Sequence, residues 1–93
     1  MTKYRVLLSQ TAVSQLKLLD AKKRGRIKEV LRNLEESPFQ NRSGADIKKL
    51  VTHDEPPLFR IRIGDYRAIY FVLGDEVRVT EIIHRSKGYK WLE

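Results

Sequence analysis

Arginine alternates with apolar residues in one short segment near the middle of the chain. In Phe59–Ile63, the apolar side chains are separated by Arg60 and Arg62, so an extended backbone would place both guanidinium groups on one face. Gly64-Asp65 follows and can form a tight hairpin turn, and Arg67 comes just after it. Arginine stays charged and presents a planar set of donors that fits phosphate oxygens. The segment therefore predicts a phosphate-binding platform on a β-hairpin.

Further candidate residues come from the end of the chain and from a lysine pair before the hairpin. A final strand would end near His84 and Arg85, ahead of a basic and aromatic tail. His84 is a candidate acid or base, although a histidine that is simply hydrogen-bonded at a strand end is the plainer interpretation. Arginines that alternate on a strand are also common as a merely solvated surface. The lysines with a candidate role in RNA binding are Lys48, Lys49, Lys87 and Lys90.

The composition indicates one globular domain with a polyanionic partner. The chain has 93 residues, of which 41% are hydrophobic and 33% charged, and its formal net charge is +7. A chain of this length predicts a single domain over residues 1–93. The basic balance favours nucleic acid or an acidic protein segment as the partner, although a soluble protein with a basic surface would share it.

Several classes of site and location are disfavoured by what the sequence lacks. There is no cysteine, so disulfides, thiolate chemistry and zinc sites built on cysteine are excluded. The two histidines, His53 and His84, are far apart in the sequence, and we expect neither a metal nor a cofactor. The longest apolar run, Ala68–Leu73, is too short to span a bilayer, and the N-terminus lacks the apolar stretch of a secretory signal. We expect a cytoplasmic protein that makes no membrane contact.

Apolar periodicity predicts the elements that position these residues. A first strand is expected over Tyr4–Leu8, followed by a helix over Thr11–Leu19. Asp20–Gly25 is polar and reads as the hinge of a helical hairpin, whose second helix is Arg26–Glu36 with one apolar stripe. Ser37-Pro38 then ends the helix. Three strands are expected over Phe59–Ile63, Tyr66–Leu73 and Glu76–His84, with a fourth, shorter one over Asp46–Val51.

The order of these elements predicts an α+β fold. Strands joined by two-residue turns must run antiparallel, so the N-terminal strand and helical hairpin would precede three to four antiparallel strands in one twisted sheet. The helical hairpin would cover one face and leave the other partly open. If the covered face holds the apolar residues of Phe59–Ile63, then Arg60 and Arg62 point to the open face. The side of Arg67 depends on whether the turn bulges, which the sequence leaves open.

The chain resembles the RelE/ParE superfamily of toxins from bacterial and archaeal toxin–antitoxin pairs. The resemblance rests on the order of elements and on the stretches KKL, LFRIRIGDYRAIYFV and EIIHRSKGYK, and it extends from Tyr4 to Tyr89. Its most specific part is Leu58–Tyr70, and the arrangement from His84-Arg85 to Tyr89 is a second, weaker hallmark. It implies a RelE-like fold, and arginines in place of lysines with a short C-terminus look like archaeal members.

The resemblance implies different activities in different branches. RelE-like members enter the ribosomal A site and cut messenger RNA there, whereas ParE-like members poison DNA gyrase. By position, the resemblance assigns the catalytic set Arg60, Arg62, Arg67, Arg85 and Tyr89, which favours a ribosome-dependent endoribonuclease. Bacterial RelE often has lysine at the first two positions, and arginine essentially never loses its proton, so Arg60 and Arg62 should not transfer protons. An inactive module that only binds an antitoxin stays a third alternative.

The implied reaction uses the 2′-hydroxyl of the RNA, which attacks the adjacent phosphorus and leaves a 2′,3′-cyclic phosphate. We expect Arg62 and Arg67 to bind the phosphate oxygens, Arg60 to orient the RNA backbone, and Arg85 to stabilise developing charge. Tyr89 is the candidate base, because nearby guanidinium groups lower the pKa of a phenol from about 10 towards neutrality. Stacking on a base is its alternative role. The implied partners are messenger RNA, the ribosome with its RNA, and a cognate acidic RelB-like antitoxin that folds onto the basic surface.

Overall fold

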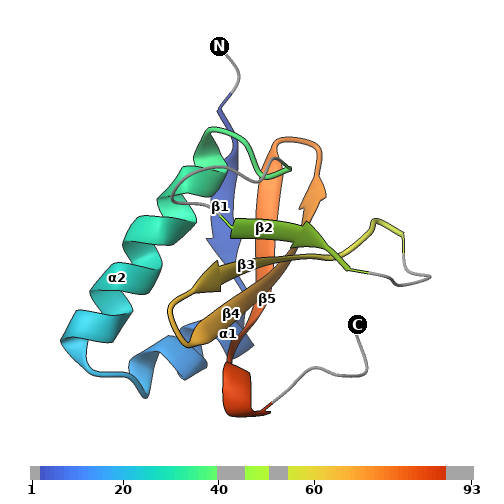
Figure 1. The fold of residues 1–93 in the computed structure, drawn as a ribbon. Coiled ribbons are helices and arrows are strands. Elements are labelled where there is room, and N and C mark those ends of the chain that lie inside the picture. Colours follow the sequence, from blue (N-terminus) through green and yellow to red (C-terminus); the bar gives the residue numbers. More distant parts are fainter. Residues whose placement is uncertain (1–2, 40–45, 51–54, 88–93) are drawn as a thin grey trace.

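Five strands form one mixed sheet in the computed structural model, which describes residues 3–39, 46–50 and 55–87 (Figure 1). Their order across the sheet is β1-β5-β4-β3-β2, and the four strands from β2 to β5 are antiparallel as expected. The first strand, at one edge, runs parallel to β5, which the sequence did not indicate. The strands are β1 (Arg5–Leu8), β2 (Asp46–Lys49), β3 (Phe59–Ile63), β4 (Tyr66–Leu73) and β5 (Glu76–His84).

Two glycine turns fix the register of the three central strands. Gly64 joins β3 to β4 and Gly74 joins β4 to β5, with φ values of +59° and +63°. Glycine adopts this left-handed conformation without the steric penalty of a side chain, and such turns suit the twist of a hairpin. The bounds of β3, β4 and β5 are those that the alternating pattern predicted.

Two capped helices connect β1 to the rest of the sheet. Helix α1 (Gln10–Lys17) begins after Ser9, whose Oγ accepts a hydrogen bond from the Ala12 amide at 3.0 Å. Helix α2 (Ala21–Leu31) begins after Asp20, whose Oδ1 accepts from the Lys23 amide at 2.8 Å. The predicted hinge over Asp20–Gly25 is therefore wrong, because Asp20 caps α2 and the helix already begins at Ala21. A 3₁₀ turn, η1 (Arg32–Glu35), continues α2.

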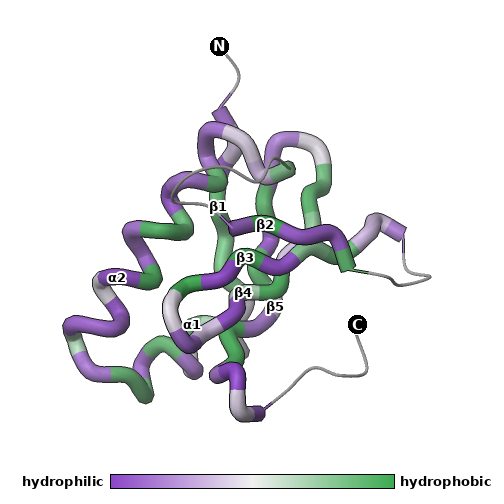
Figure 2. The backbone as a smooth tube through the Cα atoms, viewed as in Figure 1, coloured by the Kyte–Doolittle hydropathy of each residue, from purple (hydrophilic) through white to green (hydrophobic). Residues whose placement is uncertain are grey.

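The main core lies between the helices and one face of the sheet. Along α2, hydrophilic and hydrophobic residues alternate, as in a helix with one buried side (Figure 2). Tyr70 is completely buried in this core, and its hydroxyl donates a 2.7 Å hydrogen bond to the Pro38 carbonyl. None of the described helices has the length and apolar character needed to cross a membrane. The buried core residues include Ala12, Leu16, Ile27 and Leu31 from the helices, and Ile61, Ile63, Ala68, Val77, Val79 and Ile82 from the strands.

On the other sheet face, the buried apolar cluster among the described residues is small. Leu50 and Ile69 are buried there, and Leu58 and Ile83 pack against them. No residue of a described helix belongs to this cluster. This second face therefore leaves room for polar residues, and the candidate site is built on it.

Candidate active site

Strand pairing orders the second sheet face into rows that run across neighbouring strands. Side chains opposite one another in a paired register lie on the same face, with Cβ atoms about 4.5–5.5 Å apart. We call the first of these rows the arginine row; it consists of Asp46, Arg62, Arg67 and Ile83. The adjacent middle row consists of Lys48, Arg60, Ile69 and Glu81.

Arg62 and Arg67 face each other directly across β3 and β4. The register therefore settles the side of Arg67, which the sequence left open. Like charges in opposed positions destabilise a sheet, so this pairing costs free energy unless an anion offsets it. Arg62 is half exposed, with its Nε 3.6 Å from Asp46 Oδ2. Arg67 donates to the Tyr66 carbonyl at 3.2 Å, and within the described part of the chain no carboxylate pairs with it. The two guanidinium groups together retain donors for a bound anion.

Arg60 lies on the expected face but is not exposed there. It is 8% exposed, and its Nη1 donates to the Asp46 carbonyl at 3.0 Å and to Asp46 Oδ1 at 3.2 Å. Asp46 thus binds Arg60 through one carboxylate oxygen and lies near Arg62 with the other. The expectation that the Arg60 side chain is exposed on this face is wrong, because the side chain is buried and its guanidinium is bound to Asp46. Its geometry suits a residue that holds Asp46, and through it Arg62, in place.

Arg85 is brought to the hairpin turn by a backbone contact. Its amide donates to the Asp65 carbonyl at 2.8 Å, and its Nε lies 3.7 Å from Asp65 Oδ1. Both side chains are about two-thirds exposed, so this ion pair contributes little to stability and can be exchanged. The short 3₁₀ turn η2 (Arg85–Lys87) thereby lies at the same end of the sheet as the arginine row.

His84 is separated from the arginine row by the sheet itself. It pairs with Tyr66, their rings meet edge to face with centroids 5.0 Å apart, and Tyr66 packs against the helix-covered core. Its Nδ1 accepts from the Ser86 amide at 3.1 Å. His84 therefore lies on the face opposite the arginine row, and its role as a reserve acid or base stays a prediction.

Comparison with known proteins gives this arrangement a family. A sequence model described as the ParE toxin of the type II toxin–antitoxin system parDE matches residues 6–89. The chain belongs to the RelE/ParE superfamily of toxins. It is similar to Toxin RelE3 of Methanocaldococcus jannaschii, with 32% identity over 87 residues that cover 94% of this chain and 97% of the relative.

Two archaeal crystal structures share the fold of this toxin. One is the RelE–RelB complex of Pyrococcus horikoshii, with 30% identity, a TM-score of 0.77, and coverage of 95% of this chain and 100% of that chain. The other is the RelB–RelE antitoxin–toxin complex of Methanococcus jannaschii, with 30% identity, a TM-score of 0.69, and coverage of 94% and 99%. The predicted RelE-like α+β fold is confirmed.

The four candidate lysines of this toxin do not lie on one surface. Lys48 is exposed and pairs with Arg60, so it extends the basic surface. Lys49 is also exposed, but it pairs with Phe59 and therefore lies on the helix-covered side of β2. Lys87 is exposed in η2. Tyr89 and Lys90 lie outside the described residues, so their predicted roles stay predictions.

Asp46 is the site residue that sequence reasoning missed. It stands at the start of an expected strand, and nothing local to it indicates a partner. Only the antiparallel register of β2 against β3 places it opposite Arg62 and within reach of Arg60. The available signal was a single acidic residue ahead of Lys48 and Lys49. Without the pairing of β2 with β3, it does not indicate an arginine partner.

Proposed function

We propose that this toxin is a ribosome-dependent endoribonuclease that cleaves messenger RNA and thereby blocks translation. The observation that supports this most strongly is the direct opposition of Arg62 and Arg67. A phosphodiester gains negative charge on its non-bridging oxygens as it becomes a phosphorane. Two guanidinium groups that are already held together stabilise that charge without further reorganisation, and this differential stabilisation accelerates the reaction.

The roles of the arginines follow from their positions. Arg62 and Arg67 bind the non-bridging oxygens, while the RNA 2′-hydroxyl attacks phosphorus and the 5′-oxygen leaves. Arg85, at the same end of the sheet, exchanges Asp65 for the leaving group or the flanking phosphate. Arg60 acts as a positioning residue, because it fixes the carboxylate of Asp46 beside Arg62. Tyr89 stays the candidate base on the strength of the family resemblance.

The need for the ribosome follows from the chemistry of the arginine row. Arginine stabilises charge well but does not transfer protons at physiological pH, so Arg62 and Arg67 supply only part of the catalysis. Correct placement of the 2′-hydroxyl in line with the leaving oxygen is worth a large rate factor. We propose that the ribosomal A site provides this placement, which also assigns the toxin to the cytoplasm. The proposed reaction uses no metal and no cofactor.

An acidic antitoxin is the proposed natural inhibitor. The two archaeal structures described above are complexes of RelE with RelB. This chain has a net charge of +7, and Arg62 of its arginine row is half exposed. An antitoxin segment with carboxylates at matching positions would neutralise Arg62 and Arg67 and exclude RNA from them.

Cleavage of a defined message on programmed ribosomes tests the proposal. Primer extension should show cuts within the A-site codon for the wild-type chain. Arg67→Ala should lower the cleavage rate by at least about 100-fold, as expected when a charge-stabilising donor is removed. Lys49→Ala is the matched control, because Lys49 is exposed on the opposite side of an edge strand. Wild-type cleavage by Arg67→Ala would overturn the assignment.

Gyrase poisoning is the second candidate, because the matching family model is that of a ParE toxin. In this case induction of the toxin would leave messages intact and produce DNA breaks that depend on gyrase. Arg67→Ala should then have little effect on toxicity. Observing both intact messages and gyrase-dependent breaks would replace the nuclease proposal with this one.

A further inference from the structure

We infer that the second sheet face contains a nucleobase-stacking subsite formed by Leu7, Phe71 and Arg78, apart from the arginine row. The inference rests on the proposed function, since its ligand is a base of the same RNA strand that the arginine row cleaves. It adds a contact outside the proposed catalytic set. The contact would contribute to substrate binding and would not take part in the chemical step.

The register places these three side chains in a row of their own. Phe71 pairs with Arg78 across β4 and β5, and Arg78 pairs with Leu7 across β5 and β1. On β4, Phe71 follows Arg67 by four residues, so both side chains lie on the same face. At about 3.3 Å per residue, the two positions are about 13 Å apart. A few nucleotides of single-stranded RNA can span that distance.

The row borders a cavity of about 400 Å³. Its lining includes Leu7, Ser9, Phe71, Arg78 and Thr80. This volume lies within the range of sites that bind small molecules. Leu7 is 41% exposed, so its side chain is accessible to a ligand in the cavity. An exposed aliphatic side chain, a half-buried aromatic ring and a guanidinium plane are the groups on which an unpaired base stacks.

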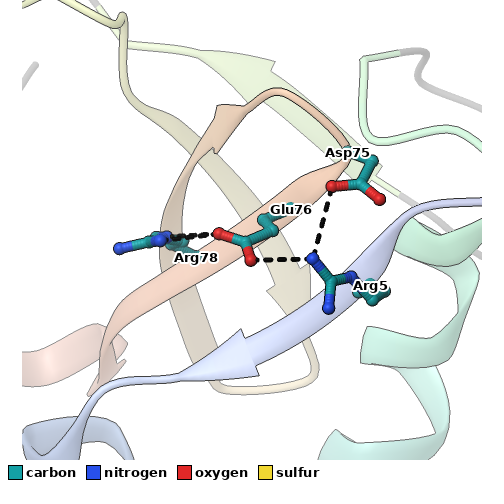
Figure 3. A network of polar contacts seen from close by, with 4 residues as sticks. All are labelled: Arg5, Asp75, Glu76 and Arg78. Carbon is teal, nitrogen blue, oxygen red and sulfur yellow. Dashed lines mark hydrogen bonds and ion pairs between the residues drawn. The ribbon is translucent and has the colours of Figure 1, made fainter.

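Two hydrogen bonds to one carboxylate oxygen orient the half-exposed guanidinium of Arg78. Its Nε and Nη2 both donate to Glu76 Oε1, at 3.0 and 2.6 Å, and Glu76 Oε2 accepts from Arg5 at 2.9 Å (Figure 3). Asp75 lies 3.5 Å from the same Arg5 nitrogen. A planar group that is already oriented loses less entropy when a ring stacks on it than a freely rotating side chain does.

The charge balance of this network favours a base over a phosphate as the ligand. Two arginines are matched by two carboxylates, so the network of Arg5, Asp75, Glu76 and Arg78 has no net charge (Figure 3). A phosphate would have to compete with Asp75 and Glu76 for these donors. A neutral, flat base needs no free positive charge and gains from the apolar ring of Phe71. The arginine row stays the phosphate site, because no carboxylate of the described residues pairs with Arg67.

Substitutions of Phe71 separate stacking from mere bulk. Phe71→Leu keeps an apolar side chain but removes the ring, and Phe71→Trp keeps an aromatic face. Phe71→Leu should weaken binding of a fluorescein-labelled single-stranded RNA oligonucleotide about 5- to 100-fold by fluorescence anisotropy, and should lower cleavage on ribosomes at limiting toxin. Phe71→Trp should behave as the wild type. Leu73→Ala is the control, because Leu73 is exposed on the same face two residues further along β4.

Circular dichroism melts show whether each variant is folded, and the proposal is judged on variants that melt as the wild type does. Should Phe71→Leu destabilise the fold, Arg78→Gln provides the same test from the other side of the cavity. Unchanged oligonucleotide binding by both variants would overturn the subsite. The failure of the proposed function looks different: the wild-type chain itself would leave ribosome-bound messages uncut, and the subsite would fall with it.

Discussion

The two faces of this sheet have opposite chemical tasks. On the helix-covered face, most inward residues of the central strands are buried, and Ile61, Ala68 and Tyr70 are each 0% exposed. On the other face, Arg62 is opposed to Arg67, and the apolar cluster around Ile69 is small. Hydrophobic burial on the helix-covered face stabilises the fold. This stability offsets the free-energy cost of the two opposed arginines on the other face.

The largest effect on stability should come from the covered face. Ile61→Ala removes a completely buried side chain and leaves a cavity, which should lower the free energy of unfolding by about 2–5 kcal/mol. Urea denaturation followed by circular dichroism measures this change. A loss below about 1 kcal/mol would mean that the core tolerates voids and that the contrast between the faces is weaker than described.

Asp46→Asn should have the next largest effect, although Asp46 lies on the site face. It replaces the charge-assisted hydrogen bond to the buried guanidinium of Arg60 by a neutral one, which should cost about 1 kcal/mol or more. Asp75→Asn is the control, because its ion pair with Arg5 is exposed and contributes little. Equal denaturation midpoints for the two variants would contradict the positioning role of Arg60.

Arg62→Ala should separate stability from activity. Removing one of two opposed cations relieves repulsion, so the free energy of unfolding should stay unchanged or rise by up to about 1 kcal/mol. Cleavage of ribosome-bound message should fall steeply in the same variant. A variant that loses stability and activity together would indicate that Arg62 is a structural residue.

The smallest effect should come from the exposed network around Glu76. Glu76→Gln weakens the contacts to Arg5 and Arg78, and exposed ion pairs of this kind contribute at most about 1 kcal/mol. The difference from the wild type should shrink further as salt is added, because salt screens such pairs. Denaturation at low and high sodium chloride measures it. A salt-independent loss of several kcal/mol would show that β1 depends on these ion pairs more than on its backbone pairing.

Local sequence pattern was enough to predict β3, β4 and β5 to the residue. Alternation of apolar side chains and the two glycine turns are local signals, and they do not depend on distant parts of the chain. The parallel pairing of β1 with β5 was not predictable in this way, because each residue of β1 pairs with a residue 71 positions later in the chain. The start of α2 was missed because the capping oxygen of Asp20 outweighed the glycine and basic residues that follow it.

The candidate site was predictable in type but only partly in arrangement. Arginines on one face of a hairpin follow from strand alternation, whereas the burial of Arg60 depends on the register that brings Asp46 to it. The face of His84 depends on a bulge in β5. The register passes from Tyr70 paired with Val79 to Ile69 paired with Glu81, which leaves Thr80 unpaired and shifts the parity of all later residues. Neither feature has a local sequence signal.

The most direct test of the arginine row is a structure of the toxin on a ribosome programmed with a message methylated at the 2′-oxygens. Methylation blocks the attacking hydroxyl and preserves the complex. We predict that the scissile phosphate lies between the guanidinium groups of Arg62 and Arg67. A phosphate bound elsewhere, with both arginines facing solvent or paired with protein carboxylates, would contradict the account.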